Sequence, residues 1–179
     1  MTQQNSKLKA FISYARADKL YFNLLKRGIA VHSNRMAIEW DSWEDTQIPV
    51  GADWDVFIQD KIQTCDFAIL LISGNYLYSE YINENELKNF IIKDSGNSFF
   101  VFPILIEPCN FRKDPELSKK QFFACSGEDY GLPNIPDLTY ADLVRISDGG
   151  KILPNPNRER YHINLVGKIE EAIEYKHLC

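Results

Sequence analysis

The amino-acid sequence predicts an α/β domain of the flavodoxin-like kind, a three-layer sandwich around a central, mostly parallel sheet of five strands. The first observation is the segment Phe67–Ile72, a continuous apolar run that ends at a polar cluster and is typical of a strand buried on both faces. The second is the helical spacing of apolar residues that begins at about Ser79. The third is the alternation of strand-like and helix-like patterns, which favours parallel strands with helices on both faces.

The part of the chain before this strand predicts two strands and two helices, joined by turns and one long loop. The loop is rich in polar residues, Pro and Gly, and it is longer than the roughly 2–6 residues of most such connections. The expected elements are a strand at Leu8–Tyr14, a turn that ends at Asp18 as a helix cap, a helix from Leu20 to about Ser33, a strand at Met36–Trp40, the loop Asp41–Gly51 and a helix at Ala52–Cys65.

The part of the chain after the central helix gives a weaker signal. A fourth strand is expected at Phe99–Ile106, where Pro103 indicates an edge position or a bulge. An irregular fifth strand is expected at Leu143–Leu153, and a closing amphipathic helix at Tyr161–Tyr175. No internal repeat or domain boundary is visible, so residues 1–179 are expected to form a single domain.

Composition and charge exclude several classes of function. The formal net charge of −5 disfavours a generic binder of nucleic acid or of anionic membranes. The apolar runs are shorter than the roughly 18 residues that a membrane span needs, and the N-terminus has no signal-peptide core. The four cysteines form no C-x-x-C pair, and the three histidines form no H-E-x-x-H motif. We therefore expect reduced thiols, a cytoplasmic location and no metal site.

Glu86 is the candidate for chemistry on the predicted third helix. In a regular α-helix the apolar side chains of Ile82 and Phe90 would lie roughly 40° to either side of it, and Ser79 would lie almost directly above it. A carboxylate with apolar neighbours, near the crevice at the carboxyl edge of a sheet, is a candidate for catalysis. The alternative is a glutamate at the boundary of the core with its carboxylate in water.

Three motifs in order carry a family resemblance. The first is A-F-I-S-Y-A-R-A-D at Ala10–Asp18, a strand followed by a hydroxyl-aromatic turn and an acidic residue. The second is the strand-to-loop segment Trp40–Trp54, and the third is the buried strand, S-x-N-Y turn and Ser-to-Glu spacing within Cys65–Leu87. Together they resemble the TIR (Toll/interleukin-1 receptor) domain family, and most closely its prokaryotic NAD-cleaving type. The resemblance is firm over residues 8–106 and thin over 107–160.

Two positions depart from the pattern of that family. Enzymatic members often have an aromatic residue four positions before the glutamate, where this chain has Ile82, with Tyr81 one residue earlier. The segment that resembles the BB loop has P-V-G at Pro49–Gly51, where many animal adaptors have adjacent Pro and Gly. The second departure disfavours a purely adaptor function.

The resemblance implies cleavage of NAD⁺ at the nicotinamide–ribose bond to nicotinamide and linear or cyclic ADP-ribose. It implies Glu86 as the catalytic residue, NAD⁺ as the substrate rather than a cofactor, and no metal. It also implies self-assembly with other TIR domains, a separate or fused sensor, and a role in prokaryotic immune defence. The implied substrate-binding residues are Ser13, Tyr14, Arg16, Asp41, Trp43 and Ser79.

Each of these assignments has a simpler alternative. Tyr14 and Trp43 can be half-buried aromatic residues, Arg16 a solvated turn residue and Asp41 a cap of the turn after its strand. At the level of the whole chain, the alternative to the enzyme is a TIR–TIR interaction module that catalyses nothing. Release of nicotinamide from NAD⁺ by the purified protein distinguishes the two.

Overall fold

In the part of the chain that the structure describes, the sheet is parallel and has four strands. The computed structural model describes residues 8–33, 38–42, 53–94, 99–123, 125–135 and 137–178. Within them the strands lie in the order β2-β1-β3-β4, and every pair of neighbours is parallel. The strands are β1 (Leu8–Tyr14), β2 (Ile38–Ser42), β3 (Phe67–Ile72) and β4 (Phe100–Leu105).

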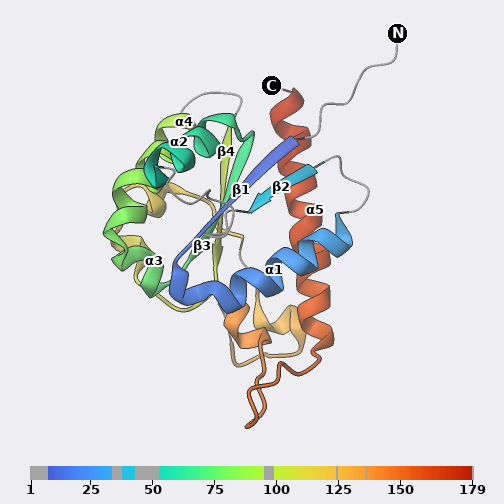
Figure 1. The fold of residues 1–179 in the computed structure, drawn as a ribbon. Helices are drawn as coiled ribbons and strands as arrows, with labels where there is room; N and C mark the ends of the chain where they lie inside the picture. The colour runs from blue at the N-terminus through green and yellow to red at the C-terminus, as the bar shows by residue number, and fades with distance from the viewer. Residues whose placement is uncertain are drawn as a thin grey trace.

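Helices cover both faces of the sheet, which confirms the predicted three-layer α/β architecture. Figure 1 shows α1 and α5 on one side of the sheet and α2, α3 and α4 on the other. The helices are α1 (Lys19–His32), α2 (Trp54–Thr64), α3 (Gly74–Tyr78), α4 (Lys88–Asp94) and α5 (Pro156–Leu178). In the described part of the chain, no helix is long and apolar enough to cross a membrane.

β3 is the central strand, and it is buried along its whole length, as predicted. Its alternate side chains belong to two separate apolar cores, because successive residues of a strand point to opposite faces. Phe67, Ile69 and Leu71 pack in the core under α1 and α5, and Ala68, Leu70 and Ile72 pack in the core under α2, α3 and α4.

β4 is an edge strand, which confirms the expectation drawn from Pro103. A proline has no N–H to donate, so an edge position accommodates it. The carbonyl of Pro103 accepts a hydrogen bond from the backbone N–H of Phe123 at 2.9 Å, and Ile104 forms a single parallel bridge with Phe123. Beyond β4 the described chain therefore adds one bridge to the sheet rather than a full strand.

The expected fifth strand at Leu143–Leu153 is wrong. The segment begins at the end of a 3₁₀ helix, Tyr140–Leu143, and then folds back on itself. Ile146 forms an antiparallel bridge with Ile152, and the backbone N–H of Ser147 donates to the carbonyl of Lys151 at 2.9 Å. The turn includes Gly150 at a φ of 75°, a conformation that glycine adopts easily. The two apolar halves thus pair with each other instead of with the sheet.

The third helical region is not the continuous α-helix that the sequence predicts. The expected turn at Ser73-Gly74-Asn75 is already the start of α3, where the Ser73 hydroxyl accepts a hydrogen bond from the Tyr76 N–H at 3.0 Å. α3 ends before Ser79, and a π-helical turn, η3 (Ile82–Leu87), precedes α4. The placement of Ser79, Ile82 and Phe90 around Glu86, which assumed a regular α-helix, therefore does not apply to this segment.

Candidate active site

Three polar side chains meet in the core at the carboxyl edge of the sheet. Ser13 comes from the end of β1, Tyr76 from α3 and Glu86 from η3. The Ser13 hydroxyl donates to Oε2 of Glu86 at 2.6 Å and lies 3.1 Å from the Tyr76 hydroxyl. All three residues are buried, and Glu86 is 6% exposed. We call these three residues the Glu86 network.

The environment of Glu86 places its proton equilibrium near neutral pH. Burial raises the pKa of its carboxyl group from 4.5 to about 7, because desolvation disfavours the charged form. The hydrogen bond from Ser13 acts in the opposite direction, since it stabilises the carboxylate. A buried acid with a pKa near 7 can change its protonation state under physiological conditions, which is characteristic of functional sites.

Tyr76 completes the network and was not predicted as a site residue. Burial, with the Glu86 charge as the second cause, raises the pKa of Tyr76, so its hydroxyl stays protonated. When Ser13 donates its one proton to the carboxylate, Tyr76 donates to Ser13. The network then runs from Tyr76 through Ser13 to Glu86. The signal in the sequence was the Tyr of the S-G-N-Y motif, whose polar group is buried in an apolar core.

The π-helical turn sets the direction of Glu86. In η3 the side chains of Ile82, Glu86 and Leu87 are buried, whereas Glu84 is exposed. The carbonyl of Asn85 accepts hydrogen bonds from two side-chain amides, Gln59 at 2.9 Å and Asn89 at 2.6 Å. These bonds satisfy a backbone group that the irregular turn frees, and π-helical turns occur frequently at functional sites.

A second buried carboxylate lies next to the network. Asp18 was expected to cap the first helix, but it makes no side-chain capping bond. Its carboxylate instead accepts from the Ser73 hydroxyl at 2.5 Å and from the Asn75 side-chain amide at 2.7 Å. These bonds join the turn after β1 to the start of α3, and they fix the helix that carries Tyr76.

Three other predicted site residues, Tyr14, Arg16 and Ser79, are not members of the Glu86 network. Ser79 ends α3, and its hydroxyl accepts a hydrogen bond from the Ile82 N–H at 3.4 Å, which is a local capping contact. The half-buried ring of Tyr14 stacks on Phe22 with 4.0 Å between ring centroids. Arg16 lies in the 3₁₀ turn Arg16–Asp18 and is exposed.

The two residues predicted from the second strand are only partly covered by the structure. Asp41 belongs to β2 and pairs with Phe11 of β1 in the register of the sheet. This register places the backbone of Asp41 beside the strand that carries Ser13. Trp43 and most of the loop Asp41–Gly51 lie outside the described residues.

Two of the three histidines, which form no motif along the sequence, lie close together in the structure. His32, at the end of α1, lies with Glu159 and His162 of α5, and one ligand atom from each of the three residues lies within 4.8 Å of the others. No sequence pattern predicts this cluster, because the two histidines are distant along the chain and the packing of α1 on α5 brings them together.

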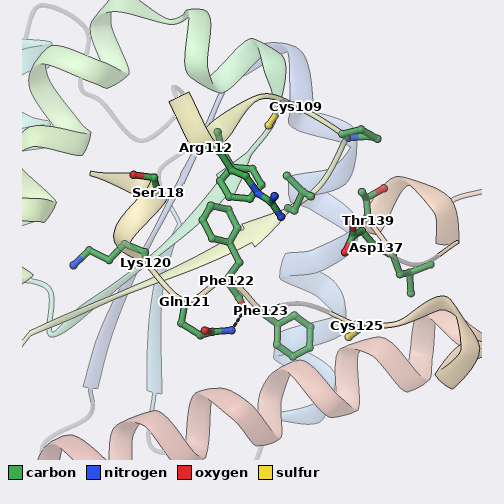
Figure 2. Close-up of a pocket in the computed structure, with 14 residues that line it drawn as sticks. Cys109, Arg112, Ser118, Lys120, Gln121, Phe122, Phe123, Cys125, Asp137 and Thr139 are labelled. Carbon is green, nitrogen blue, oxygen red and sulfur yellow. Dashed lines mark hydrogen bonds between the residues drawn. The ribbon is translucent and has the colours of Figure 1, made fainter. Parts of the chain in front are cut away.

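A separate hollow of about 660 Å³ lies beyond β4. Figure 2 shows its lining, in which Arg112, Phe122 and Phe123 lie at the centre of the view. The rings of Phe111 and Phe122 are 4.1 Å apart between centroids, and Lys120 is paired with Asp94. The residues that line this hollow do not include any member of the Glu86 network.

The protein is a parallel α/β domain in which a buried glutamate, Glu86, follows the central strand β3. The family model described as "TIR domain" matches residues 10–138, and this chain belongs to the TIR domain family. The match includes β2, β3, β4, all of β1 except its first two residues, and the Glu86 network.

Two comparisons with individual proteins accompany the family match. The chain is 28% identical over 105 residues to "Uncharacterized protein y4lF" of Sinorhizobium fredii, a match that covers 59% of this chain and 32% of that protein. The chain thus spans about a third of that relative's length. A crystal structure of the TIR domain of the Toll-related receptor TRR-2 from Hydra magnipapillata aligns with a TM-score of 0.45 and 18% identity, covering 63% of this chain and 80% of the other.

Proposed function

We propose that this TIR domain is an NAD⁺ glycohydrolase of the prokaryotic type, with Glu86 as its catalytic residue. The observation that carries the proposal is the buried carboxylate of Glu86, held by Ser13 at the carboxyl edge of a parallel sheet. Ligands of open α/β sheets bind at this edge. TIR domains include NAD⁺-cleaving enzymes, and the motif that carries Glu86 is where this chain most resembles them.

The proposed reaction breaks the bond between C1′ of the ribose and the nitrogen of nicotinamide. Nicotinamide is cationic in NAD⁺ and leaves with the bonding electron pair, so no acid is required. The ribose becomes oxocarbenium-like, and the ionised carboxylate of Glu86 stabilises the developing positive charge. Water then attacks C1′ and releases a proton to give ADP-ribose, or a nitrogen of the adenine attacks to give a cyclic product.

The neighbours of Glu86 have distinct roles in this proposal. Ser13 is a positioning residue that directs one carboxylate oxygen, and Tyr76 holds Ser13. Arg16 is exposed after the same strand, where its guanidinium can pair with a phosphate of the substrate. Tyr14, Asp41, Trp43 and Ser79 remain proposed contacts of the substrate.

The direct test compares two glutamates of the same helical turn. Glu86→Gln keeps the size of the side chain and a hydrogen-bond acceptor for Ser13 but removes the negative charge, so it should abolish release of nicotinamide from NAD⁺. Glu84→Gln is the matched control, because Glu84 is exposed, and it should retain wild-type activity. Nicotinamide release by Glu86→Gln at a rate near that of the wild type would refute the assignment.

The second candidate is a TIR–TIR interaction module without catalysis. It is favoured by the same carboxylate, since Glu86 is only 6% exposed and already accepts a hydrogen bond, as a structural residue does. Mass spectrometry of NAD⁺ incubated with concentrated protein separates the candidates. Linear or cyclic ADP-ribose supports the enzyme, whereas intact NAD⁺ together with self-association supports the module. In either case we propose a role in prokaryotic immune defence under the control of a separate or fused sensor.

A further inference from the structure

A second polar cluster joins the ends of the chain's first and last long helices. His32 is the final residue of α1, and Glu159 and His162 lie one turn apart near the start of α5. The Glu159 carboxylate lies 3.4 Å from Nε2 of His32 and 3.8 Å from Nδ1 of His162. The NAD⁺ chemistry proposed above uses none of these residues.

The spacing of these atoms fits the coordination sphere of a metal ion. Ligand atoms at about 2.0–2.1 Å from Zn²⁺ in tetrahedral geometry lie roughly 3.3 Å from one another. The three ligand atoms of the cluster are within 4.8 Å of one another, and two of their separations are 3.4 and 3.8 Å. These separations are close to those expected for three ligand atoms around one ion.

The two ring nitrogens of His162 have different surroundings. Its side chain is 3% exposed, and Nδ1 has no hydrogen-bond partner among the described residues. Nε2 lies 2.8 Å from the Tyr140 hydroxyl. When Nε2–H donates to Tyr140, the lone pair of Nδ1 is free for a cation, and a ligating histidine commonly has such a partner on its other nitrogen.

A glycine of α1 leaves space for the ring of His162. The ring lies against Gly28, where an added Cβ would come within 2.2 Å of Nδ1. Glycine within a helix costs roughly 1 kcal/mol relative to alanine, so its presence here is explained by the close approach of the imidazole.

We propose that His32, Glu159 and His162 form a binding site for a divalent transition-metal ion, namely Zn²⁺. The bound ion would link α1 to α5. Two imidazoles and one carboxylate are a donor set that zinc accepts. The side chains of His32 and Glu159 are 25% and 58% exposed, so the ion has access from solvent and water can fill a fourth position. The negative charge of Glu159 offsets the nearby Arg158.

The experiment titrates Zn²⁺ into protein that has been stripped with a chelator. We expect one saturable site per chain by calorimetry. At a free Zn²⁺ concentration of about 100 times Kd, Tm should rise by roughly 5–10 °C, because the ion binds the folded state. Co²⁺ should bind at the same site without a thiolate charge-transfer band, which distinguishes the cluster from Cys109 and Cys125.

Two variants at the exposed side of the cluster test the ligands without disturbing the core. His32→Gln and Glu159→Gln should each lower the affinity for Zn²⁺ by a factor of about 100 or more and remove the rise in Tm. Glu170→Gln is the matched control, because Glu170 is an exposed glutamate on the same helix. His177→Gln, near the far end of α5, controls for weak binding by a single histidine. The proposal is overturned if the wild type shows no stoichiometric site, or if both ligand variants bind as tightly as Glu170→Gln.

Discussion

The raised pKa of Glu86 predicts how activity depends on pH. The proposed reaction needs the carboxylate, which forms as pH rises through about 7. The rate of NAD⁺ cleavage should therefore rise roughly tenfold per pH unit below 7 and level off above it. A profile of nicotinamide release from pH 5 to 9 measures this dependence. A rate that stays constant across that range would contradict a catalytic carboxylate with this pKa.

The same pKa predicts an effect on stability with a defined sign. The pKa of Glu86 is higher in the folded protein than its ordinary value of 4.5, so the folded state binds more protons between pH 4.5 and about 7. Its contribution to stability is fully present below pH 4.5 and is lost as pH rises through about 7. Glutamine does not titrate, so Glu86→Gln does not lose stability in this way as pH rises. Its Tm should therefore equal that of the wild type at pH 5 and exceed it by several degrees at pH 8. Thermal melts at both pH values check this, and a difference that shrinks as pH rises would contradict it.

The hydroxyl of Tyr76 should act through Ser13 on the acid. Tyr76→Phe removes the donor that supports Ser13, so the carboxylate is less stabilised and its pKa rises further. The pH–rate profile should move to higher pH, while the loss of one hydrogen bond costs about 1 kcal/mol of stability. Tyr78→Phe on the same helix is the control, because Tyr78 is 90% exposed. An unchanged pH midpoint in Tyr76→Phe would show that Tyr76 does not influence the acid.

At the scale of elements, β3 is the part of the fold least able to accept a charge. Ile69 is fully buried in the core under α1 and α5, so Ile69→Asp places an unpaired carboxylate where no water reaches it. We expect this variant not to fold, as measured by circular dichroism and by the absence of a cooperative melt. Val56→Asp on α2 is the control, because Val56 is 65% exposed. A soluble Ile69→Asp protein with a cooperative transition would contradict the central position of β3.

The elements that the sequence predicted well are those fixed by local apolar patterns. β1 and β3 have the predicted bounds, and β4 differs by one residue at each end. The π-helical turn was missed because its geometry depends on Gln59, an amide donor from another helix, and the fifth strand was wrong because its two halves pair with each other. Periodicity in a sequence does not reveal such partners.

The candidate site was predicted in part, for a related reason. The family motifs predicted Ser13 and Glu86 as site residues, and the structure shows the hydrogen bond that joins them. Ser79 was placed above Glu86 by the geometry of a regular α-helix, which the π-helical turn breaks. Tyr76 was overlooked because an aromatic residue next to a turn has the same pattern whether its hydroxyl faces water or a buried partner.

At the scale of the whole molecule, we predict that activity depends on assembly. The predicted loop Asp41–Gly51 contains Ile48, Pro49 and Val50, and apolar residues on a long loop often indicate a partner. The resemblance of this segment to the BB loop of TIR domains implies that it packs against a neighbouring domain, so one copy would provide only part of the site. Specific activity should therefore rise with protein concentration.

The loop can be tested separately from the core. Ile48→Asp together with Val50→Asp should lower activity without lowering Tm, because the predicted role of these residues is in contact between domains. Specific activity is measured over a hundredfold range of concentration, with light scattering to follow the mass of the particles. Constant specific activity from a protein that remains a monomer throughout would mean that the apolar residues pack on their own domain.

The pairing of α1 with α5 also determines when this fold can be completed during synthesis. α1 leaves the ribosome early, but its apolar face needs residues of α5 that are made more than a hundred positions later. At roughly 5–20 residues per second, that interval is on the order of 10 s. During this time the side of the sheet that α1 and α5 cover lacks α5, so the nascent chain exposes apolar side chains that are buried in the finished fold. A protein shortened to the family match at residue 138 would retain that exposure permanently.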